Sequence, residues 1–550
     1  MQQKISLKGN IIKFDKNTLN KDIEEVIDAR FENGEFMLES SIDDLHDPYL
    51  LIDMDKAVER IKKAKENSEK IMIFGDYDVD GVTSTSILMH FFKKVGMLAS
   101  YRIPNRMKDG YGMKSYFIDE IAELGVSLII TVDCGTRDIE VIKYAKTKGI
   151  DVIVTDHHAV PDLTHSEAIA IVNPKRPDCN YLYKNLAGAG VAFKLMQALA
   201  YEYFDKEEAR KYIIESIDIA AIGTVADCMR LTGENRIIVM EGLKQIKKSR
   251  SLGIRKLIED KLNDDLDGDL FGFLIGPRIN AAGRLDSAYK AVNLILNNTD
   301  SVFQTISEIE KLNETRKYLT KEFSLDAMNK VNKNDNLLFY ISPSINHGII
   351  GIVAGRITEQ FYKPCICLKD EGDKLVASCR SPEYHSIIET LEKYKDYFLH
   401  FGGHKQAAGF SISKEKFSEF KTKIINELNK KDFSKYKKEI QIDKVIKLEE
   451  LGFSFLSKIN KYKPFGIGND KPLFLLENLE AEKIEFIGKG RDHLKFTTKH
   501  GFKIFAFYMG DYYEEIKRSK KNVSIVFDLS EDSWNGNKNL MLKVVDIILD

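Results

Sequence analysis

The sequence predicts an α/β protein built on a doubly wound, mostly parallel sheet. From residue 71 onward, short apolar runs alternate with amphipathic segments that end at glycine, which is the pattern of successive strand–helix–strand units. The apolar runs are continuous, as expected of parallel strands that are covered on both faces. We expect these strands at residues 71–74, 128–132, 152–155 and 168–172.

Composition limits the class of protein. A chain of 550 residues is too long for one hydrophobic core, so several domains are expected. The formal net charge is −2, which gives the whole chain no basic footprint for coating nucleic acid. No apolar run has the length of a membrane span, Met1–Asn20 is polar, and the six cysteines form no CxxC pair. We therefore expect a cytoplasmic protein with no membrane contact and no disulfide framework.

The first predicted strand leads into three closely spaced carboxylates. The stretch IMIFGDYDVDG places Asp76, Asp78 and Asp80 on the loop after the strand. Like charges at this spacing repel unless protons or cations compensate them, and oxygen ligands suit Mg²⁺ or Mn²⁺. A solvated acidic turn is the alternative interpretation. We expect Thr83 or Ser84 to cap the helix that follows.

A calcium-binding helix–loop–helix is excluded for this loop. That motif requires a bidentate glutamate at its twelfth position, which is Ile87 here, and a helix before the loop instead of a strand. What remains is a carboxylate cluster at the carboxyl end of a strand, where open α/β sheets bind their ligands.

Later strands also end in groups that can bind metal. Asp133 follows the second strand, and Asp156, His157 and His158 follow the third. The segment YIIESIDIAAIGTVADCMRL is predicted to be a helix that reaches Asp227 after a break at its Gly-Thr pair. A mixture of carboxylates and imidazole suits Mn²⁺ or Mg²⁺ better than zinc. Adjacent histidines with a purely structural role are the alternative.

Two further segments carry candidate phosphate ligands. FLIGPRINAAGRL, residues 273–285, contains glycines and arginines in a pattern unsuited to a plain helix, and an interdomain elbow is its structural interpretation. Its Arg278, Asn280 and Arg284 can approach a nucleic-acid backbone, because the arginine donor fork fits phosphate oxygens. Arg106, in the loop RIPNRMKDGYG, is a similar candidate. Residues 301–332 are predicted to form one long helix that connects two lobes.

A second α/β unit and a strand-rich region complete the chain. NLLFYIS is a predicted strand, HGIIGIVAGRITEQFYK a helix and CICLKDEGDKLVASCRS a hairpin. A Gly-Gly-His turn at Gly402, Gly403 and His404 would let backbone N–H groups approach phosphate, although His404 could merely cap the turn. After about residue 438, strand-like runs and a hairpin turn at 534–536 predict a β-domain. Aromatic and basic residues interleave in this domain, and we assign about half of them to the core: Phe496, Lys503, Phe505 and Phe507.

Several of these motifs resemble those of one enzyme family. GDYDVDG, VDCG, TDHH and TVADCMRL resemble, in order and spacing, the four motifs of the DHH phosphoesterase superfamily. GDYDVDGVTST, RIPNRMKDGYG and GPRINAAGRL are similar to the RecJ single-stranded-DNA exonucleases. The resemblance implies a DHH domain that a long helix joins to a smaller DHHA1 domain, with a five-stranded OB-type barrel after it. The implied boundaries are a lead-in at 1–70, DHH at 71–300, the helix at 301–332, DHHA1 at 333–437 and the barrel at 438–550.

The resemblance also implies roles for residues. Two divalent metal ions, Mn²⁺ or Mg²⁺, would be held by Asp78, Asp80, Asp133, His157 and Asp227, with Asp76 as a ligand or its support. Asp133 would bridge the metals, His158 would face the scissile phosphate, and Asp156 would orient an imidazole. Arg278 would contact the reacting phosphate, Ser378 and Arg380 the terminal 5′-phosphate, and Gly402, Gly403 and His404 the substrate. Ile345 departs from the family pattern, which has tryptophan there.

The implied activity is 5′→3′ hydrolysis of single-stranded DNA to 5′-mononucleotides in DNA repair and recombination. The alternatives are a phosphodiesterase for short oligonucleotides or cyclic dinucleotides and a non-catalytic replication scaffold. The expected partners are single-stranded DNA with a free 5′ end, a helicase and a single-strand-binding protein. A monomer is expected because the cleft is built within one chain.

Overall fold

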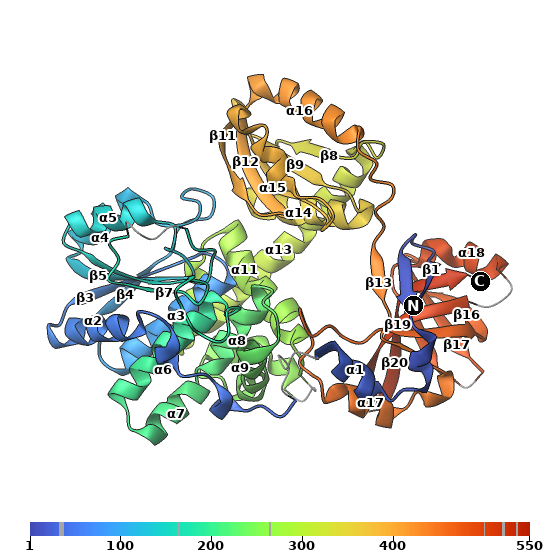
Figure 1. Ribbon diagram of the computed structural model, residues 1–550, viewed down its shortest axis with the longest axis horizontal. Helices are drawn as coiled ribbons and strands as arrows, with labels where there is room; N and C mark the ends of the chain where they lie inside the picture. The colour runs from blue at the N-terminus through green and yellow to red at the C-terminus, as the bar shows by residue number, and fades with distance from the viewer. Residues whose placement is uncertain are drawn as a thin grey trace. The chain divides into compact units, whose positions relative to one another are not determined.

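The computed structural model describes residues 1–31, 38–161, 166–262, 266–499, 501–519, 523–534 and 537–549 (Figure 1). The chain forms two compact units. One contains Glu39–Lys431 and Pro464–Asn469, and the other contains Met1–Leu38, Asp432–Lys463 and Asp470–Asp550. We call them the catalytic unit and the terminal unit. In the described residues, no helix combines the length and apolar character needed to cross a membrane.

The catalytic unit contains the predicted parallel sheet. Its five strands have the order β4-β3-β5-β6-β7, and every pairing is parallel. The strands are β3 (Lys70–Gly75), β4 (Ala99–Arg102), β5 (Val126–Val132), β6 (Asp151–Thr155) and β7 (Ala170–Val172). Helices cover both faces of the sheet, which confirms the doubly wound class. One face is covered by α2 (Met54–Glu66), α3 (Val79–Lys94) and α6 (Gly188–Tyr203). The other face is covered by α4 (Ser115–Glu123) and α5 (Ile139–Thr147).

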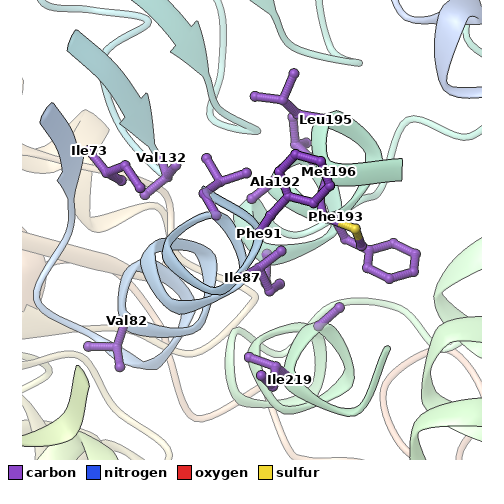
Figure 2. Packing of buried hydrophobic residues seen from close by; sticks show 14 of the residues in the cluster. Ile73, Val82, Ile87, Phe91, Val132, Ala192, Phe193, Leu195, Met196 and Ile219 are labelled. Carbon is purple, nitrogen blue, oxygen red and sulfur yellow. The ribbon is translucent and has the colours of Figure 1, made fainter. Parts of the chain in front are cut away.

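One hydrophobic core fixes the helices that carry the site. Ile73 and Val132 of the sheet face α3, which contributes Ile87 and Phe91, and Ile219 of α8 (Ile217–Ala226) packs beside them (Figure 2). Burying each such side chain stabilises the fold by about 1.5–3 kcal/mol. The ends of α3, α6 and α8 are therefore held in fixed positions at the carboxyl edge of the sheet.

The structure corrects two predictions about helix ends. Asp78, and neither Thr83 nor Ser84, caps α3 by accepting hydrogen bonds from Asp80 N (3.0 Å) and Gly81 N (3.2 Å). The helix begins at Val79, so both hydroxyl residues lie within it. The predicted break at Gly223 is also wrong, because α8 continues through it and the break falls between α7 (Lys206–Ile214) and α8. A Cβ on residue 223 would lie 2.5 Å from Ala189 Cβ, so glycine there serves close helix packing.

Residues 273–285 are helical, contrary to the prediction. A π-helical turn, η7 (Leu270–Ile275), leads directly into α11 (Gly276–Leu285). Pro277 is tolerated because it lies in the first turn, where its missing N–H needs no partner. The long connecting helix is confirmed as α13 (Ser301–Lys330). The remaining helices here are α9 (Gly233–Gln245), α10 (Leu252–Leu257) and α12 (Tyr289–Leu296).

A second sheet follows α13 with the order β11-β12-β10-β9-β8. The predicted hairpin is confirmed by antiparallel pairing of β9 (Cys365–Asp370) with β10 (Lys374–Arg380). Gly402 and Gly403 are the last residues of β11 (Phe398–Gly403) and precede the turn instead of forming it. Ile345 is fully buried, so it fills core space in place of the expected tryptophan. The other elements are β8 (Leu338–Ser342), β12 (Ala407–Ser413), α14 (His347–Phe361), α15 (Ile387–Glu392) and α16 (Lys414–Asn429).

The terminal unit contains a seven-stranded sheet in the order β14-β15-β19-β20-β18-β17-β16, in place of the five strands expected. The strands are β14 (Lys444–Val445), β15 (Phe474–Leu479), β16 (Ala481–Ile487), β17 (His493–Thr498), β18 (Lys503–Ala506), β19 (Val523–Trp534) and β20 (Asn537–Leu549). The predicted turn residues Asn535 and Gly536 lie outside the described residues. Phe496 is fully buried, while Phe505 and Phe507 are half-buried and stack with centroids 6.1 Å apart.

The first residues of the chain belong to the terminal unit. β1 (Gln2–Ile5) and β2 (Ile11–Phe14) form a sheet with β13 (Glu439–Gln441). The buried Lys444 ammonium donates to the carbonyl oxygens of Thr18 (3.0 Å), Leu19 (2.9 Å) and Lys21 (3.0 Å). The expected lead-in at 1–70 is thus divided between the two units. The short helices here are α1 (Ile23–Asp28), α17 (Phe453–Asn460) and α18 (Tyr513–Arg518).

Candidate metal centre

The predicted metal ligands converge at the carboxyl edge of the parallel sheet. Asp76 directly follows β3, Asp133 follows β5, and His157 lies two residues beyond β6. His157 Nε2 lies 3.2 Å from Asp133 Oδ1, 3.5 Å from Asp227 Oδ2 and 3.6 Å from Asp80 Oδ2. These contacts join residues that lie far apart in the sequence.

The ligands form overlapping groups. The donor atoms of Asp80, His157 and Asp227 lie within 4.8 Å of one another, and so do those of Asp76, Asp78 and Asp133. Asp133 also groups with His157 and His158. Asp133 therefore lies between two sets of donors, as a residue shared by two metal ions must.

The N-terminus of α6 holds one of these carboxylates. Asp80 accepts hydrogen bonds from Gly188 N and Ala189 N, each at 2.7 Å. A Cβ on residue 188 would lie 2.6 Å from Asp133 Cβ, which is closer than real contacts allow. Only glycine at 188 lets α6 bind Asp80 while Asp133 occupies the adjoining space.

The electrostatics of the cluster fit divalent cations. Burial, with repulsion from Asp78, raises the pKa of Asp80 to about 7, and burial with repulsion from Asp80 raises the pKa of Asp227 to about 9. Burial and neighbouring carboxylates also raise the pKa of Asp76 and Asp133 well above the ordinary value. One buried oxygen of each of these two side chains, Oδ1, has no hydrogen-bond partner.

The imidazole of His157 completes the donor set. Burial, together with the charge of His158, lowers its pKa to about 3, so the ring is neutral and its lone pair is free at neutral pH. Carboxylate oxygens that lack partners, combined with one neutral imidazole, are the ligands expected for Mn²⁺ or Mg²⁺. The residues present therefore fit the two metal ions.

Asp156 orients the second histidine, as predicted. It accepts hydrogen bonds from His158 Nδ1 (2.8 Å) and from the backbone N–H groups of His158 (3.1 Å) and Thr136 (3.0 Å). Although burial opposes both shifts, this pairing lowers the pKa of Asp156 and raises the pKa of His158. An imidazolium is therefore favoured at the edge of the metal centre.

Sequence reasoning missed Tyr111. Its hydroxyl lies 3.2 Å from His158 Nδ1 and 3.2 Å from the carbonyl oxygen of Asp133. Tyr111 as a whole is 40% exposed, so it lies at the surface of the molecule. Its position between the glycines of KDGYG was the one available signal, because glycines allow a loop to approach a site closely.

A segment from far along the sequence supports Asp227. Asp227 ends α8, and Leu231 N in the turn after it donates to Ile467 O at 2.7 Å. Gly468 adopts a φ of +79°, and a Cβ there would lie 3.2 Å from Arg230 Cβ. We call residues 464–469 the clasp. These residues fall within the barrel expected at 438–550, whereas the structure groups them with the catalytic unit. No periodic pattern in the sequence links them to Asp227.

The candidate phosphate ligands near the candidate metal-binding residues are arginines. The Arg106 guanidinium lies 4.2 Å from the centre of the Tyr77 ring, and its buried Nε has no hydrogen-bond partner. Arg284 Nη1 donates to Gly348 O at 2.8 Å, and burial together with the charge of Arg106 lowers the pKa of Arg284 to about 10. Two close guanidinium groups with few acceptors suit an anionic ligand.

The other predicted residues occupy three separate places. Arg278 is bound to Glu310 Oε1 and Leu274 O, each at 2.7 Å, and Asn280 Oδ1 is buried without a partner. Ser378 and Arg380 lie beside α14, where a Cβ on Gly351 would approach Arg380 Nη2 to 2.9 Å and Ser378 Oγ to 3.1 Å. The remaining three, Gly402, Gly403 and His404, are exposed on the β11–β12 hairpin.

Comparison with known proteins places the chain in a family. Residues 70–224 match the DHH family N-terminal domain, 334–430 the DHHA1 domain and 442–546 the RecJ OB domain. The single-stranded-DNA-specific exonuclease RecJ of Salmonella typhimurium is 33% identical, over 90% of this chain and 90% of its own. The chain belongs to the RecJ family.

Other RecJ proteins show the same relationship. The single-stranded-DNA-specific exonuclease RecJ of Bacillus subtilis is 35% identical over 94% of this chain, which spans 66% of that protein's length. RecJ from Thermus thermophilus, solved in complex with Mn²⁺, is 28% identical and superposes with a TM-score of 0.81 over 98% of this chain and 79% of its own. The same protein was solved with Mg²⁺, at a TM-score of 0.77.

Proposed function

We propose that this chain is a metal-dependent exonuclease that hydrolyses single-stranded DNA from the 5′ end and releases 5′-mononucleotides. The observation that carries this proposal is the position of Asp133 between two sets of metal-binding donors. RecJ relatives named as single-stranded-DNA-specific exonucleases, and one solved with Mn²⁺, support the substrate and the cofactor.

The site residues divide the work of phosphodiester hydrolysis. When bound, two metal ions supply Lewis-acid stabilisation to the attacking and leaving oxygens. Asp76, Asp78, Asp80, Asp133, His157 and Asp227 hold them. His158, kept as an imidazolium by Asp156, directs an N–H toward the scissile phosphate and balances its developing charge.

Recognition of the 5′ end sets the polarity. Arg284, Ser378 and Arg380 hold the terminal 5′-phosphate, and Arg106 holds the phosphate on the metal side. Arg278 and Asn280 approach the reacting phosphate from α11, and Gly402, Gly403 and His404 contact the strand from the companion sheet. A fixed distance between the terminal phosphate and the metals makes one nucleotide the unit of release.

The terminal unit guides the rest of the strand. OB folds bind single strands through aromatic stacking and backbone charge, and Phe505 and Phe507 form a stacked, half-buried pair next to Lys503. We also propose that the protein is a cytoplasmic monomer that acts in repair and recombination. A helicase supplies it with single strands, and a single-strand-binding protein works beside it.

The test is a time course with Mn²⁺ on a long single strand that carries a 5′-phosphate and a 3′ label. We expect mononucleotides from the free 5′ end, with a matched duplex and a strand blocked at its 5′ end both spared. Cleavage of a dinucleotide alone would instead establish the small-substrate phosphodiesterase. If Arg380→Ala loses activity on 5′-phosphorylated strands and keeps it on unphosphorylated strands, this result supports the assigned 5′-end contact.

A further inference from the structure

Two adjoining cavities lie on the catalytic unit, away from the metal centre. Their volumes are about 610 and 520 Å³, and Lys211, Glu215 and Arg250 line both of them. Each volume falls within the range of about 300–1,000 Å³ that is typical of ligand sites. We call the two cavities together the basic groove.

Two helices lead from the basic groove to the metal centre. Helix α3 carries Asp80 in its first turn and the groove residues Lys93 and Lys94 in its last, so its 16 residues span about 24 Å between the two places. Helix α8 begins two residues after Glu215 and ends at Asp227. The basic groove is therefore a separate site, and its side chains do not contact a phosphate that reacts at the metals.

Positive charge exceeds negative charge in the basic groove, although the whole chain has a formal net charge of −2. Seven lysines and arginines line it, against three glutamates. Glu208 pairs with Lys94 at 3.3 Å, and Glu215 with Arg250 at 3.2 Å. Three of the basic residues form no ion pair within the part of the chain that the structure describes: Lys93, Lys248 and Arg255.

The wall of the basic groove is organised before any ligand binds. The Arg250 guanidinium lies over the Tyr212 ring, 4.2 Å from its centre, and Arg250 Nε donates to Glu215 O at 3.0 Å. His90 also lines the groove, and its buried Nε2 has no hydrogen-bond partner. Burial, with the charge of Arg250, lowers the pKa of His90 to about 4, so the ring is neutral at pH 7. Because buried polar atoms normally have partners, this nitrogen is available to a ligand.

These groups define the chemistry of the ligand. Guanidinium and ammonium groups without carboxylate partners suit phosphate oxygens. One cavity contains the unpaired Lys93 and the other contains Lys248 and Arg255, so a ligand that contacts both needs more than one phosphate. The neutral imidazole of His90 suits an uncharged part of the same ligand, such as a sugar or a base.

We propose that the basic groove binds a ligand with two or more linked phosphate groups. Two sources share this chemistry: a free nucleoside polyphosphate, and the backbone of a nucleic-acid strand. The site is independent of the metal centre, because the cations of the groove supply the countercharge that metal ions supply at the carboxylates.

The direct test measures how far a bound probe protects lysines of the full chain from acetylation, read by mass spectrometry. A chelator is present, so that no Mn²⁺ holds phosphate at the metal centre. The probes are ATP, a short DNA strand blocked at both ends, and inorganic phosphate. We expect ATP or the strand, at saturation, to reduce acetylation of Lys93 and Lys248 by about fivefold or more, and inorganic phosphate at the same concentration to leave it unchanged. Protection by ATP alone assigns a nucleotide, and protection by the strand assigns a nucleic-acid backbone.

Two lysines outside the basic groove serve as internal controls. Lys63, in the last turn of α2, and Lys143, in α5, are exposed as Lys93 and Lys248 are. Their acetylation should not change with any probe. Equal protection of all four lysines, or no protection of Lys93 and Lys248 by either ATP or the strand, would overturn the proposal.

Paired variants separate local contacts from general attraction between charges. Lys93→Ala combined with Lys248→Ala should weaken the protecting probe by about tenfold, since each loses a charge-assisted contact. Lys63→Ala combined with Lys143→Ala removes the same charge and should leave the affinity unchanged. Lys211, which lines both cavities, is the reporter of protection in both proteins. If the two double variants bind the probe equally, the basic groove is not its site and the proposal is wrong.

Discussion

At the scale of single residues, the site stores unfavourable charge that metal ions compensate. Asp133 is buried among other carboxylates and has a φ of +60°, a conformation that costs most side chains energy. We predict that Asp133→Asn lowers hydrolysis by more than about 100-fold, since even residues that only support a ligand contribute 10–100-fold. Asparagine tolerates this backbone conformation, so the metal-free variant should melt at or above the temperature of the unmodified protein. Parallel rate and melting measurements check both parts, and retained hydrolysis would contradict the shared-ligand role.

The same carboxylates predict how stability depends on pH. The pKa of Asp80 is about 7 and that of Asp227 about 9 in the metal-free folded protein, against an ordinary value of 3.8. Between these values the folded state binds more protons than the unfolded state, so the free energy of unfolding falls as pH rises from about 4 to about 9. Bound Mn²⁺ replaces those protons and removes the loss.

The measurement is the melting temperature with Mn²⁺ minus that with a chelator, at mildly acidic and at mildly alkaline pH. The difference cancels the titration of distant groups, and we expect it to grow with pH. A constant difference would show that the carboxylates do not carry these protons.

The convergence of most carboxylates and the histidine of the candidate metal centre was predictable from sequence, because each strand end carries its own motif. Tyr111 was not, since its role depends on a contact with His158, which lies 47 positions away, and a lone tyrosine carries no spacing signal. The helix cap was misassigned for a similar reason. Asp78 belongs to the candidate metal-binding cluster and also caps α3. Thr83 and Ser84 follow it in the sequence and are equally good cap residues by type.

At the scale of elements, the close approach of α6 to Asp80 and Asp133 fixes the positions of these two carboxylates. We predict that Gly188→Ala weakens Mn²⁺ affinity by about tenfold or more, because its Cβ would lie 2.7 Å from Asp133 Oδ1 and must displace a ligand. Gly355→Ala, in α14, is the matched control, since a Cβ on residue 355 meets nothing within 4 Å. Calorimetric titration with Mn²⁺ should show a loss in the first variant only, and equal losses in both would reject the packing argument.

Sequence patterns identified the elements better than they identified breaks within them. Continuous apolar runs located the parallel strands, and the charged periodic stretch located α13. Glycines predicted a helix break at Gly223 and, together with arginines, an irregular segment at residues 273–285. In the structure these glycines instead permit close packing. Whether a helical glycine marks a break or a contact depends on its tertiary neighbour, which one sequence does not show.

At the scale of the whole molecule, long-range pairing was the least predictable feature. β2 pairs in parallel with β13, more than 400 residues later, and the clasp binds the turn after Asp227 across another long separation in sequence. No periodic pattern in the sequence indicates either contact, so the segments that form them are predicted only as ordinary strands or loops. The parts of the chain on either side of the clasp belong to the terminal unit, so this unit is covalently connected to a support of the metal centre.

This connection predicts that a change in the clasp alters metal binding. Gly468→Ala introduces a Cβ 3.2 Å from the Arg230 side chain and should shift the Leu231 N–Ile467 O contact, which weakens Mn²⁺ affinity by about tenfold. Gly149→Ala is the control, because its φ of +75° gives the same backbone penalty of about 1–2 kcal/mol, while nothing lies within 4 Å of the added Cβ. We expect hydrolysis in the clasp variant to be restored by high Mn²⁺, and the control to need no more Mn²⁺ than the unmodified protein. An unchanged Mn²⁺ requirement in Gly468→Ala would show that Asp227 is positioned by the catalytic sheet and its helices alone.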